Sequence, residues 1–298
     1  MSESFVAGAG RLDAVVAARL AVTRADAQRA ISGGGVLVDG SRRPKSYRLL
    51  GGERVEVDLA PSLELPPEGP PLELRYHDEY LAVVMKPAGL PTHPTENHRS
   101  GTVVNRLLGA GVRLAARGGP LRPGIVHRLD AGTSGLLVVA SEDAVYDALV
   151  AMFKAHGADR RYVALVRGSP EHDRFEVDAP LGRRGGRIRV RASGGRQAST
   201  AFEVRERLGR ASLLEAIPRT GRTHQIRVHL SSIGHPVLGD ARYGGGGDAA
   251  SALGLTRPFL HAGRLAFDHP ITGARIDLEE PLPPDLVRAL ERARAEQR

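Results

Sequence analysis

A single carboxylate near the middle of the chain has the surroundings of a reactive group. Asp130 lies in the stretch HRLDAGTSGL (127–136), after a His-Arg-Leu triplet and before a turn of small residues that leads into an apolar strand. An aspartate in such a turn is most often a turn former. A carboxylate that is partly buried beside arginine costs desolvation, however, so a fold tends to keep it for a reason. Asp130 could be a nucleophile, a general base, a metal ligand or a structural turn residue.

The cations that could keep Asp130 ionised lie downstream, in PRTGRTHQIRVHL (218–230). An isolated carboxylate among arginines suits covalent catalysis on an anionic substrate. A metal site is disfavoured because no second acid or well-spaced histidine pair accompanies Asp130. His224 and His229 would lie on opposite faces if their segment is a strand. Ser134 lacks the G-x-S-x-G frame of a nucleophilic serine, which disfavours a serine hydrolase.

The composition bounds the class of protein. A chain of 298 residues predicts about two domains. The net charge of +8 favours an anionic partner. The absence of cysteine excludes disulfides, thiol catalysis and Cys-ligated metals. A general bias toward Arg, Ala and Gly would give the same charge. No apolar run approaches the ~20 residues of a membrane span, and the N-terminus does not resemble a secretory signal. We therefore expect a cytoplasmic protein with no membrane association.

The positive charge is concentrated in one region. Residues 154–242 hold 18 Lys and Arg against 9 Asp and Glu, and the stretch 183–196 (RRGGRIRVRASGGR) holds six arginines and no acid. Its alternation predicts a strand with Arg187, Arg189 and Arg191 on one face. The alternative is a solvated sheet edge protected by charge. Because six cations repel one another unless an anion neutralises them, we predict RNA phosphate contacts for this stretch, through Arg183, Arg184, Arg187, Arg189 and Arg191.

The first 60 residues are predicted to form a separate unit of two short helices and a small sheet. One helix carries Leu12, Val16 and Leu20 at helical spacing, and a second begins at a capping-box-like Thr23 and ends at the glycines 33–35. A strand at 36–38 is followed by an Asp39-Gly40 hairpin turn, and a closing strand is predicted at 55–57. The matching elements RLD (11–13), TRADAQRAI (23–31), GGVLVDG (34–40) and GERVEV (52–57) resemble an S4 RNA-binding domain.

A proline-rich, acidic linker at 61–73 is predicted to separate this unit from a larger domain over 74–298. In the larger domain, strand patterns (81–85, 135–140, 162–166) are interspersed with helical ones (144–153 and 284–294). The chain is thus expected to be α+β, with a small S4 domain followed by a large mixed or antiparallel sheet with flanking helices.

The larger domain resembles the RluA/RluD-type pseudouridine synthases, which isomerise uridine in RNA. The resemblance rests on blocks in a fixed order: DEYLAVVMKPAGLPTHP (78–94), GIVHRLDAGTSGLLVVA (124–140), RRYVALVRG (160–168), PRTGRTHQIRVHLSSIGHPVLGDARYG (218–244) and FLHAGRLAFDHP (259–270). It implies that Asp130 is the catalytic aspartate, which attacks C6 of the base or C1′ of the ribose, and that neither a metal nor an organic cofactor takes part.

The same resemblance implies roles for other residues. Arg227 would pair with the aspartate, and Tyr162 would stack on the target base and accept the C5 proton. Arg128 would enter the RNA helix as the uridine leaves it. Arg222 is predicted to bind RNA. Arg161 stands where the family commonly has lysine. Lys86 and Pro87 are expected to shape the turn beside the active site, with a phosphate contact as the weaker interpretation.

The resemblance and the S4 unit point to ribosomal RNA of the large subunit, or a precursor particle of that subunit, as partner of a monomeric enzyme. Two other classes stay open. One is an RNA-binding ribosome-assembly factor that keeps the fold without catalysis. The other is a carboxylate hydrolase that acts on a nucleoside, which would need a second catalytic acid.

Overall fold

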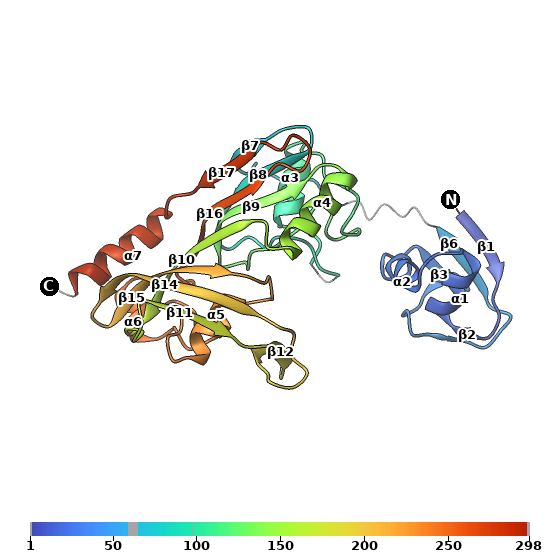
Figure 1. Cartoon of the computed structure of the whole chain (residues 1–298). Helices are drawn as coiled ribbons and strands as arrows, with labels where there is room; N and C mark the ends of the chain where they lie inside the picture. Colours follow the sequence, from blue (N-terminus) through green and yellow to red (C-terminus); the bar gives the residue numbers. More distant parts are fainter. Residues whose placement is uncertain (1, 59–64, 97, 297–298) are drawn as a thin grey trace. The chain divides into compact units, whose positions relative to one another are not determined.

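The computed structural model describes residues 2–58, 65–96 and 98–296. Two compact units are formed, one chiefly by residues up to Leu65 and the other by residues from Pro66 onward (Figure 1). Residues 59–64, which include the start of the predicted linker, lie outside the described residues. Residues 66–68 pack against the larger unit, since Glu68 N donates to Asn105 O (3.0 Å) and Asn105 Nδ2 donates to Pro66 O (3.0 Å).

The smaller unit has the predicted elements. Helices α1 (Leu12–Arg19) and α2 (Arg24–Ser32) precede a hairpin whose turn places Asp39 and Gly40 at positive φ. Leu12, Val16 and Ile31 are buried with the inward residues of the sheet. The strands are β1 (Ser2–Val6), β6 (Arg54–Asp58), β3 (Val36–Val38) and β4 (Ser41–Arg42) in that spatial order, with β2 (Gly10–Arg11) paired to β5 (Arg48–Leu49).

The larger unit is built on one mixed sheet of nine strands, which confirms the expected α+β class. Its spatial order is β11 (Arg174–Asp178), β14 (Ser199–Leu208), β15 (Ala211–Pro218), β10 (Asp159–Arg167), β16 (Leu260–Asp268), β9 (Ser134–Ala140), β8 (Leu81–Lys86) and β7 (Leu74–His77), with β17 (Arg275–Glu279) also paired to β16. Of these neighbours, only β9 and β16 run parallel; the other pairs of the described sheet are antiparallel.

Five helices flank this sheet in the described chain: α3 (Val103–Gly109), α4 (Asp143–Lys154), α5 (Gln225–Ser232), α6 (Asp248–Ala252) and α7 (Pro284–Ala295). Helix α4 buries Val145 and Leu149 against Leu136 and Phe267 of the sheet, as its amphipathic pattern predicts. Helix α5 lies beside the β14–β15 half of the sheet (Figure 1). None of the helices in the described chain has the length and apolar character needed to cross a membrane.

The register of the central strands brings two distant motifs together. Gly135 of β9 pairs with Ala262 of β16, and Ala262 pairs on its other side with Tyr162 of β10. A Cβ atom at Gly135 would lie 2.2 Å from the Ala262 carbonyl oxygen, so glycine permits the close approach of these two strands. The row across the sheet places the loop that carries Asp130, just before β9, next to the β10 tyrosine.

Candidate active site

The backbone around Asp130 is fixed by side chains from another loop. Thr92 Oγ1 donates to the Leu129 carbonyl oxygen (2.7 Å) and accepts from Leu129 N (3.2 Å). On the other side, Thr133 N donates to the Asp130 carbonyl oxygen (3.0 Å). The carboxylate of Asp130 is therefore presented from a braced turn and not from a mobile loop tip.

Lys86 stabilises the same turn through hydrogen bonds to backbone carbonyl oxygens. Its side chain is fully buried, and Nζ donates to the carbonyl oxygens of Pro87 (2.8 Å), Leu90 (2.8 Å) and Ala131 (3.1 Å). Burial lowers the pKa of Lys86 to about 7, although the charge of Asp130 acts in the opposite direction. An amine enclosed in this way supports the predicted role in turn structure and does not fit the alternative of a phosphate contact.

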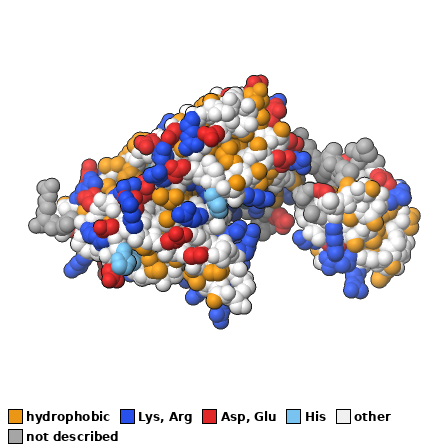
Figure 2. All heavy atoms as spheres, viewed as in Figure 1, with side chains coloured by type: hydrophobic (Ala, Val, Ile, Leu, Met, Phe, Trp, Pro, Cys, Tyr) orange, Lys and Arg blue, Asp and Glu red, His pale blue; other side chains and the backbone are white. Residues whose placement is uncertain are grey.

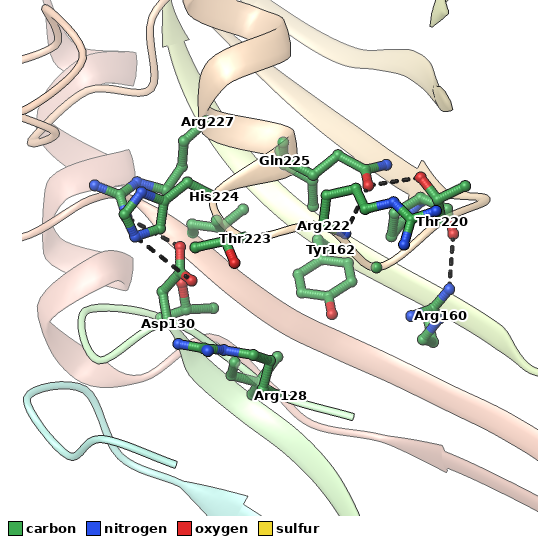
Figure 3. A pocket seen from close by; sticks show the side chains of 16 residues that line it. Arg128, Asp130, Arg160, Tyr162, Thr220, Arg222, Thr223, His224, Gln225 and Arg227 are labelled. Carbon is green, nitrogen blue, oxygen red and sulfur yellow. Dashed lines mark hydrogen bonds and ion pairs between the residues drawn. The ribbon is translucent and has the colours of Figure 1, made fainter. Parts of the chain in front are cut away.

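Arg227 lies between two carboxylates. Its Nη1 donates to Asp130 Oδ2 (2.9 Å) (Figure 3), while Nε and Nη2 donate to the two oxygens of Asp240 (2.6 and 2.9 Å). Burial alone would lower the pKa of Arg227, but the hydrogen bonds and charge of Asp240, and then those of Asp130, raise it above its usual value. The guanidinium stays charged and its fork is held rigidly by Asp240.

His224 and Tyr243 complete the surroundings of this ion pair. His224 Nδ1 lies 2.7 Å from Tyr243 Oη, and the Tyr243 ring centroid lies 5.0 Å from Cζ of Arg227. His224 precedes α5 with a left-handed backbone (φ 56°), which is uncommon for a residue other than glycine and clusters at functional sites. Burial lowers the pKa of His224 despite the nearby charge of Asp130, which favours the neutral imidazole.

Tyr162 forms the floor of a pocket that Asp130 also lines (Figure 3). The tyrosine is 8% exposed. Burial raises its pKa, with Arg160 acting to lower it and Asp130 to raise it further. Because the raised pKa keeps the phenol protonated, its oxygen has little capacity to accept a proton, whereas the ring in the pocket is available for stacking on a base.

Three further arginines line this pocket. Exposed Arg128, half-buried Arg222 and buried Arg160 line it. Arg160 Nη2 donates to Pro218 O (3.1 Å) and Arg222 Nε donates to Gln197 O (3.0 Å). Arg161, which stands where the family commonly has lysine, does not line the pocket. It pairs with Asp159 (3.0 Å) and Glu215 (3.3 Å). Alternation on strand β10 places Arg160, and not Arg161, on the same face as Tyr162.

Residues 225–229 are helical and His224 immediately precedes the helix, so the condition for the argument from opposite strand faces is not met. His229 lies inside α5, bonded to Thr200 Oγ1 (2.9 Å) and the Ala179 carbonyl oxygen (3.1 Å). Among the described residues, no three His, Cys, Asp or Glu side chains gather as metal ligands would. The sequence analysis assigned no chemical role to Asp240, which is the buried partner of Arg227.

The predicted RNA-binding arginines at 183–191 lie outside this pocket, on a two-stranded hairpin of β12 (Leu181–Arg184) and β13 (Arg187–Val190). Cross-strand pairs place Arg184, Arg187 and Arg189 on one face, and Figure 2 shows basic side chains at its end. Arg183 faces the other way, and Arg191 follows the end of β13. The expectation of Arg187, Arg189 and Arg191 on one strand face is therefore correct for the first two, since the strand ends before the third.

His127, at the start of the HRLD motif, carries a testable pH dependence. Its Nε2 accepts from Val138 N (3.1 Å), and burial lowers its pKa to about 3. In the unfolded chain the group titrates near 6.5. The unfolded state thus binds more protons between these values, and stability is lost as the pH falls from about 6.5 toward 3, by up to ~1.4 kcal/mol per pH unit.

We expect the variant His127→Gln to lose less stability than the wild type over the same pH range, whatever its stability at pH 7. Urea unfolding at half-unit steps from pH 7 to 4 measures the two slopes. Because other buried histidines contribute equally to both proteins, the difference isolates His127. Parallel slopes would show that the imidazole is not held neutral in the folded protein.

Comparison with known proteins agrees with this geometry. The pattern of the family described as RNA pseudouridylate synthase matches residues 80–232, which include Asp130, Tyr162 and Arg227, and the S4 domain pattern matches residues 10–55. The chain belongs to the RNA pseudouridylate synthase family. The predicted family and S4 domain, and the assignment to the pseudouridine synthase class of isomerases, are confirmed.

Relatives cover nearly the whole chain. A protein named Uncharacterized RNA pseudouridine synthase YlyB from Bacillus subtilis is 38% identical over 91% of this chain and 90% of its own length. Ribosomal large subunit pseudouridine synthase D from Zymomonas mobilis is 43% identical over 78% of this chain and 76% of its own. The structure of human RNA Pseudouridylate Synthase Domain Containing 4 superposes with a TM-score of 0.59 at 26% identity, over 74% of this chain and 92% of that one.

Proposed function

We propose that this protein converts uridine to pseudouridine in large-subunit ribosomal RNA, with Asp130 as the nucleophile. The observation that carries the proposal is the ion pair of Asp130 with Arg227 (2.9 Å) in a pocket that Tyr162 also lines. A charged carboxylate is thereby held beside an aromatic ring that suits an unstacked base. A purely RNA-binding assembly factor would not need this trio.

The reaction exchanges one glycosidic bond for another. Asp130 attacks the flipped uridine at C6 of the base or at C1′ of the ribose, and the bond from C1′ to N1 breaks. The uracil then turns within the pocket and C1′ bonds to C5. The bond between Asp130 and the nucleotide breaks and its electron pair returns to the carboxylate, while the C5 proton leaves to solvent and N1 takes up a proton. Atoms and electrons balance within the nucleotide, so no co-reactant is required.

The pocket offers a means to hold the uridine outside the RNA helix. Flipping costs a few kcal/mol of lost stacking, and stacking on Tyr162 restores ~1–3 kcal/mol. Arg128 is exposed at the pocket edge, where its planar cation can fill the gap that the uridine leaves. A nucleoside hydrolase would need a second free acid, but Asp240 is engaged by two nitrogens of Arg227.

The choice of ribosomal RNA rests on the S4 domain and on relatives named for the large ribosomal subunit. We place the domain boundaries at 1–60, 61–73 and 74–298, and infer that the protein acts as a cytoplasmic monomer on RNA or on a precursor particle. Tethering the S4 unit to the catalytic unit raises the effective concentration of the active site near structured RNA.

Mapping tests the substrate. Unmodified transcripts of the large- and small-subunit ribosomal RNAs are incubated with the protein, treated with carbodiimide and read by primer extension. We expect new pseudouridine stops in the large-subunit RNA alone. Stops only in the small-subunit RNA would contradict the substrate, and stops in neither transcript nor in large-subunit precursor particles would favour the assembly-factor reading.

The β12–β13 hairpin is expected to contact RNA phosphates. In the described chain, Arg184, Arg187 and Arg189 have no ion-pair partner, and we expect their joint replacement by alanine to reduce the slope of log Kd against log salt by about 2. A matched triple variant of ion-paired arginines (Arg174, Arg205 and Arg294) lowers the net charge equally. Equal slopes for both variants would assign the salt effect to net charge alone.

A further inference from the structure

A second cavity adjoins the active-site pocket in the catalytic unit. The two share five lining residues, including Arg128, Arg160 and Arg222. The second cavity extends from this shared edge toward the C-terminal end of helix α4, where Val150, Phe153 and Lys154 line it. Its volume is about 500 Å³, within the ~300–1,000 Å³ of small-ligand sites.

The mouth of this cavity is positively charged and free of acids. Arg122, Lys154 and Arg219 are exposed lining residues, and none of the described residues that line the cavity is Asp or Glu. Arg219 has an ion pair with Glu176 (3.5 Å), whereas no carboxylate partner is found for Arg122 or Lys154 among the described residues. Uncompensated cations around a hollow favour an anionic ligand.

The walls are apolar and aromatic. Ile125, Val126 and Val150 line the cavity together with Phe153. The Phe153 ring lies 4.7 Å from the ring centroid of His127, and Cζ of Arg160 lies 5.2 Å from the Phe153 centroid. Apolar walls would not stabilise a bound phosphate, but they can pack against the apolar faces of a nucleobase.

Polar atoms in the same walls lack hydrogen-bond partners within the described protein. They are His93 Nε2, His127 Nδ1 and Arg160 Nε. Because His127 Nε2 accepts from Val138 N, its proton lies on Nδ1, which is a donor. His93 Nδ1 faces the Pro94 carbonyl oxygen (2.8 Å), so its Nε2 is an acceptor. All three atoms are buried behind the cavity walls, so the edge of a base, which carries both kinds of partner, would pair with them only after neighbouring side chains shift.

We propose that this cavity binds the base of a nucleotide next to the target uridine, with its phosphates on Arg122 and Lys154. The inference rests on the proposed function, since it is the shared edge at Arg128 that places a neighbouring nucleotide there. The enzyme would thus hold two nucleotides of one RNA strand, the target over Tyr162 and its neighbour against Phe153. Contacts with the neighbour add sequence context to the choice of uridine.

Binding measurements separate base from phosphate recognition without turnover. The probes are a fluorescein-labelled dodecamer of uridine and a chain of equal length and charge that lacks bases. Val150→Trp fills the cavity, and Val150→Phe is a smaller addition should the first variant melt early. Val287→Trp, at an exposed position of helix α7, is the matched control. Arg122→Ala with Lys154→Ala removes the charged mouth, and Arg288→Ala on α7 is its control.

We expect Val150→Trp to weaken oligouridine binding roughly tenfold and to leave binding of the base-free chain unchanged. The Arg122→Ala/Lys154→Ala variant should weaken binding of both probes by the same factor, and neither α7 control should change either Kd by more than about twofold. Unchanged oligouridine binding by both cavity-filling variants, or an equal loss on the two probes, would overturn the proposal. Absence of isomerisation with this base preference intact would count against the proposed function alone.

Discussion

Replacing Asp130 by asparagine is expected to lower the rate of pseudouridine formation at least ~10⁴-fold while RNA affinity changes by less than about threefold. The amide has the shape of the carboxylate and can still accept from Arg227 Nη1, which lies 2.9 Å from Oδ2 in the wild type. The turn is held by Thr92 and Lys86 through backbone groups, so the fold does not depend on the charge. Only the nucleophile is lost.

Single-turnover conversion, read by nucleoside analysis of digested RNA, measures the rate, and filter binding measures the affinity. Asp277→Asn is the matched control, because Asp277 also pairs with an arginine (Arg264, 2.6 Å) but lies outside the pocket. We expect that control to keep wild-type activity. An Asp130→Asn enzyme that converts uridine within tenfold of the wild-type rate would rule out nucleophilic attack by Asp130.

Replacing Arg227 by glutamine is expected to lower kcat about 100-fold and to destabilise the protein by about 3–5 kcal/mol. Asp240 is 1% exposed and Asp130 is 14% exposed, so both carboxylates would lose their cation in a place with little water. Without the guanidinium, Asp130 is neither oriented nor kept charged. Arg227→Lys keeps the charge but not the fork, and should restore stability more than activity.

Arg264→Gln provides the matched control for this prediction. Arg264 also bridges two carboxylates, Asp159 (2.8 Å) and Asp277 (2.6 Å), but does so away from the pocket. Chemical unfolding and steady-state kinetics on the same preparations separate the two effects. If Arg264→Gln and Arg227→Gln reduced kcat equally at a temperature where both are folded, the role of Arg227 would be merely structural.

The sequence predicted the elements whose signals are local. Helices α1 and α2 follow from apolar spacing and from the cap at Thr23, whose Oγ1 accepts from Asp26 N (3.2 Å), and the hairpin follows from Asp39-Gly40. Asp130 and Tyr162 were recognisable from motifs that the chain keeps nearly intact. The proximity of Asp130 and Tyr162 could not be predicted from these motifs. It depends on the register of β9, β16 and β10, which pairs residues far apart in the sequence.

Sequence reasoning failed where tertiary contacts decide. The segment after His224 has β-branched residues at alternate positions and suited a strand, yet Gln225 stabilises it as the start of a helix. Its Oε1 accepts from Thr220 Oγ1 (2.7 Å) and Arg222 N (3.0 Å). The role of Asp240 was hidden because an acid in a glycine-rich loop has an ordinary local explanation. Its position in the same motif as Arg227 was the available signal.

Release of tritium from unmodified large-subunit ribosomal RNA labelled at uridine C5 tests the central claim most directly, because C5 must lose its hydrogen when it bonds to C1′. The wild-type protein should release tritium to water in equal amount to the pseudouridine formed, reaching a plateau at a whole number of sites per RNA. No release from this RNA or from large-subunit precursor particles, in a preparation that binds both, would contradict the isomerase account.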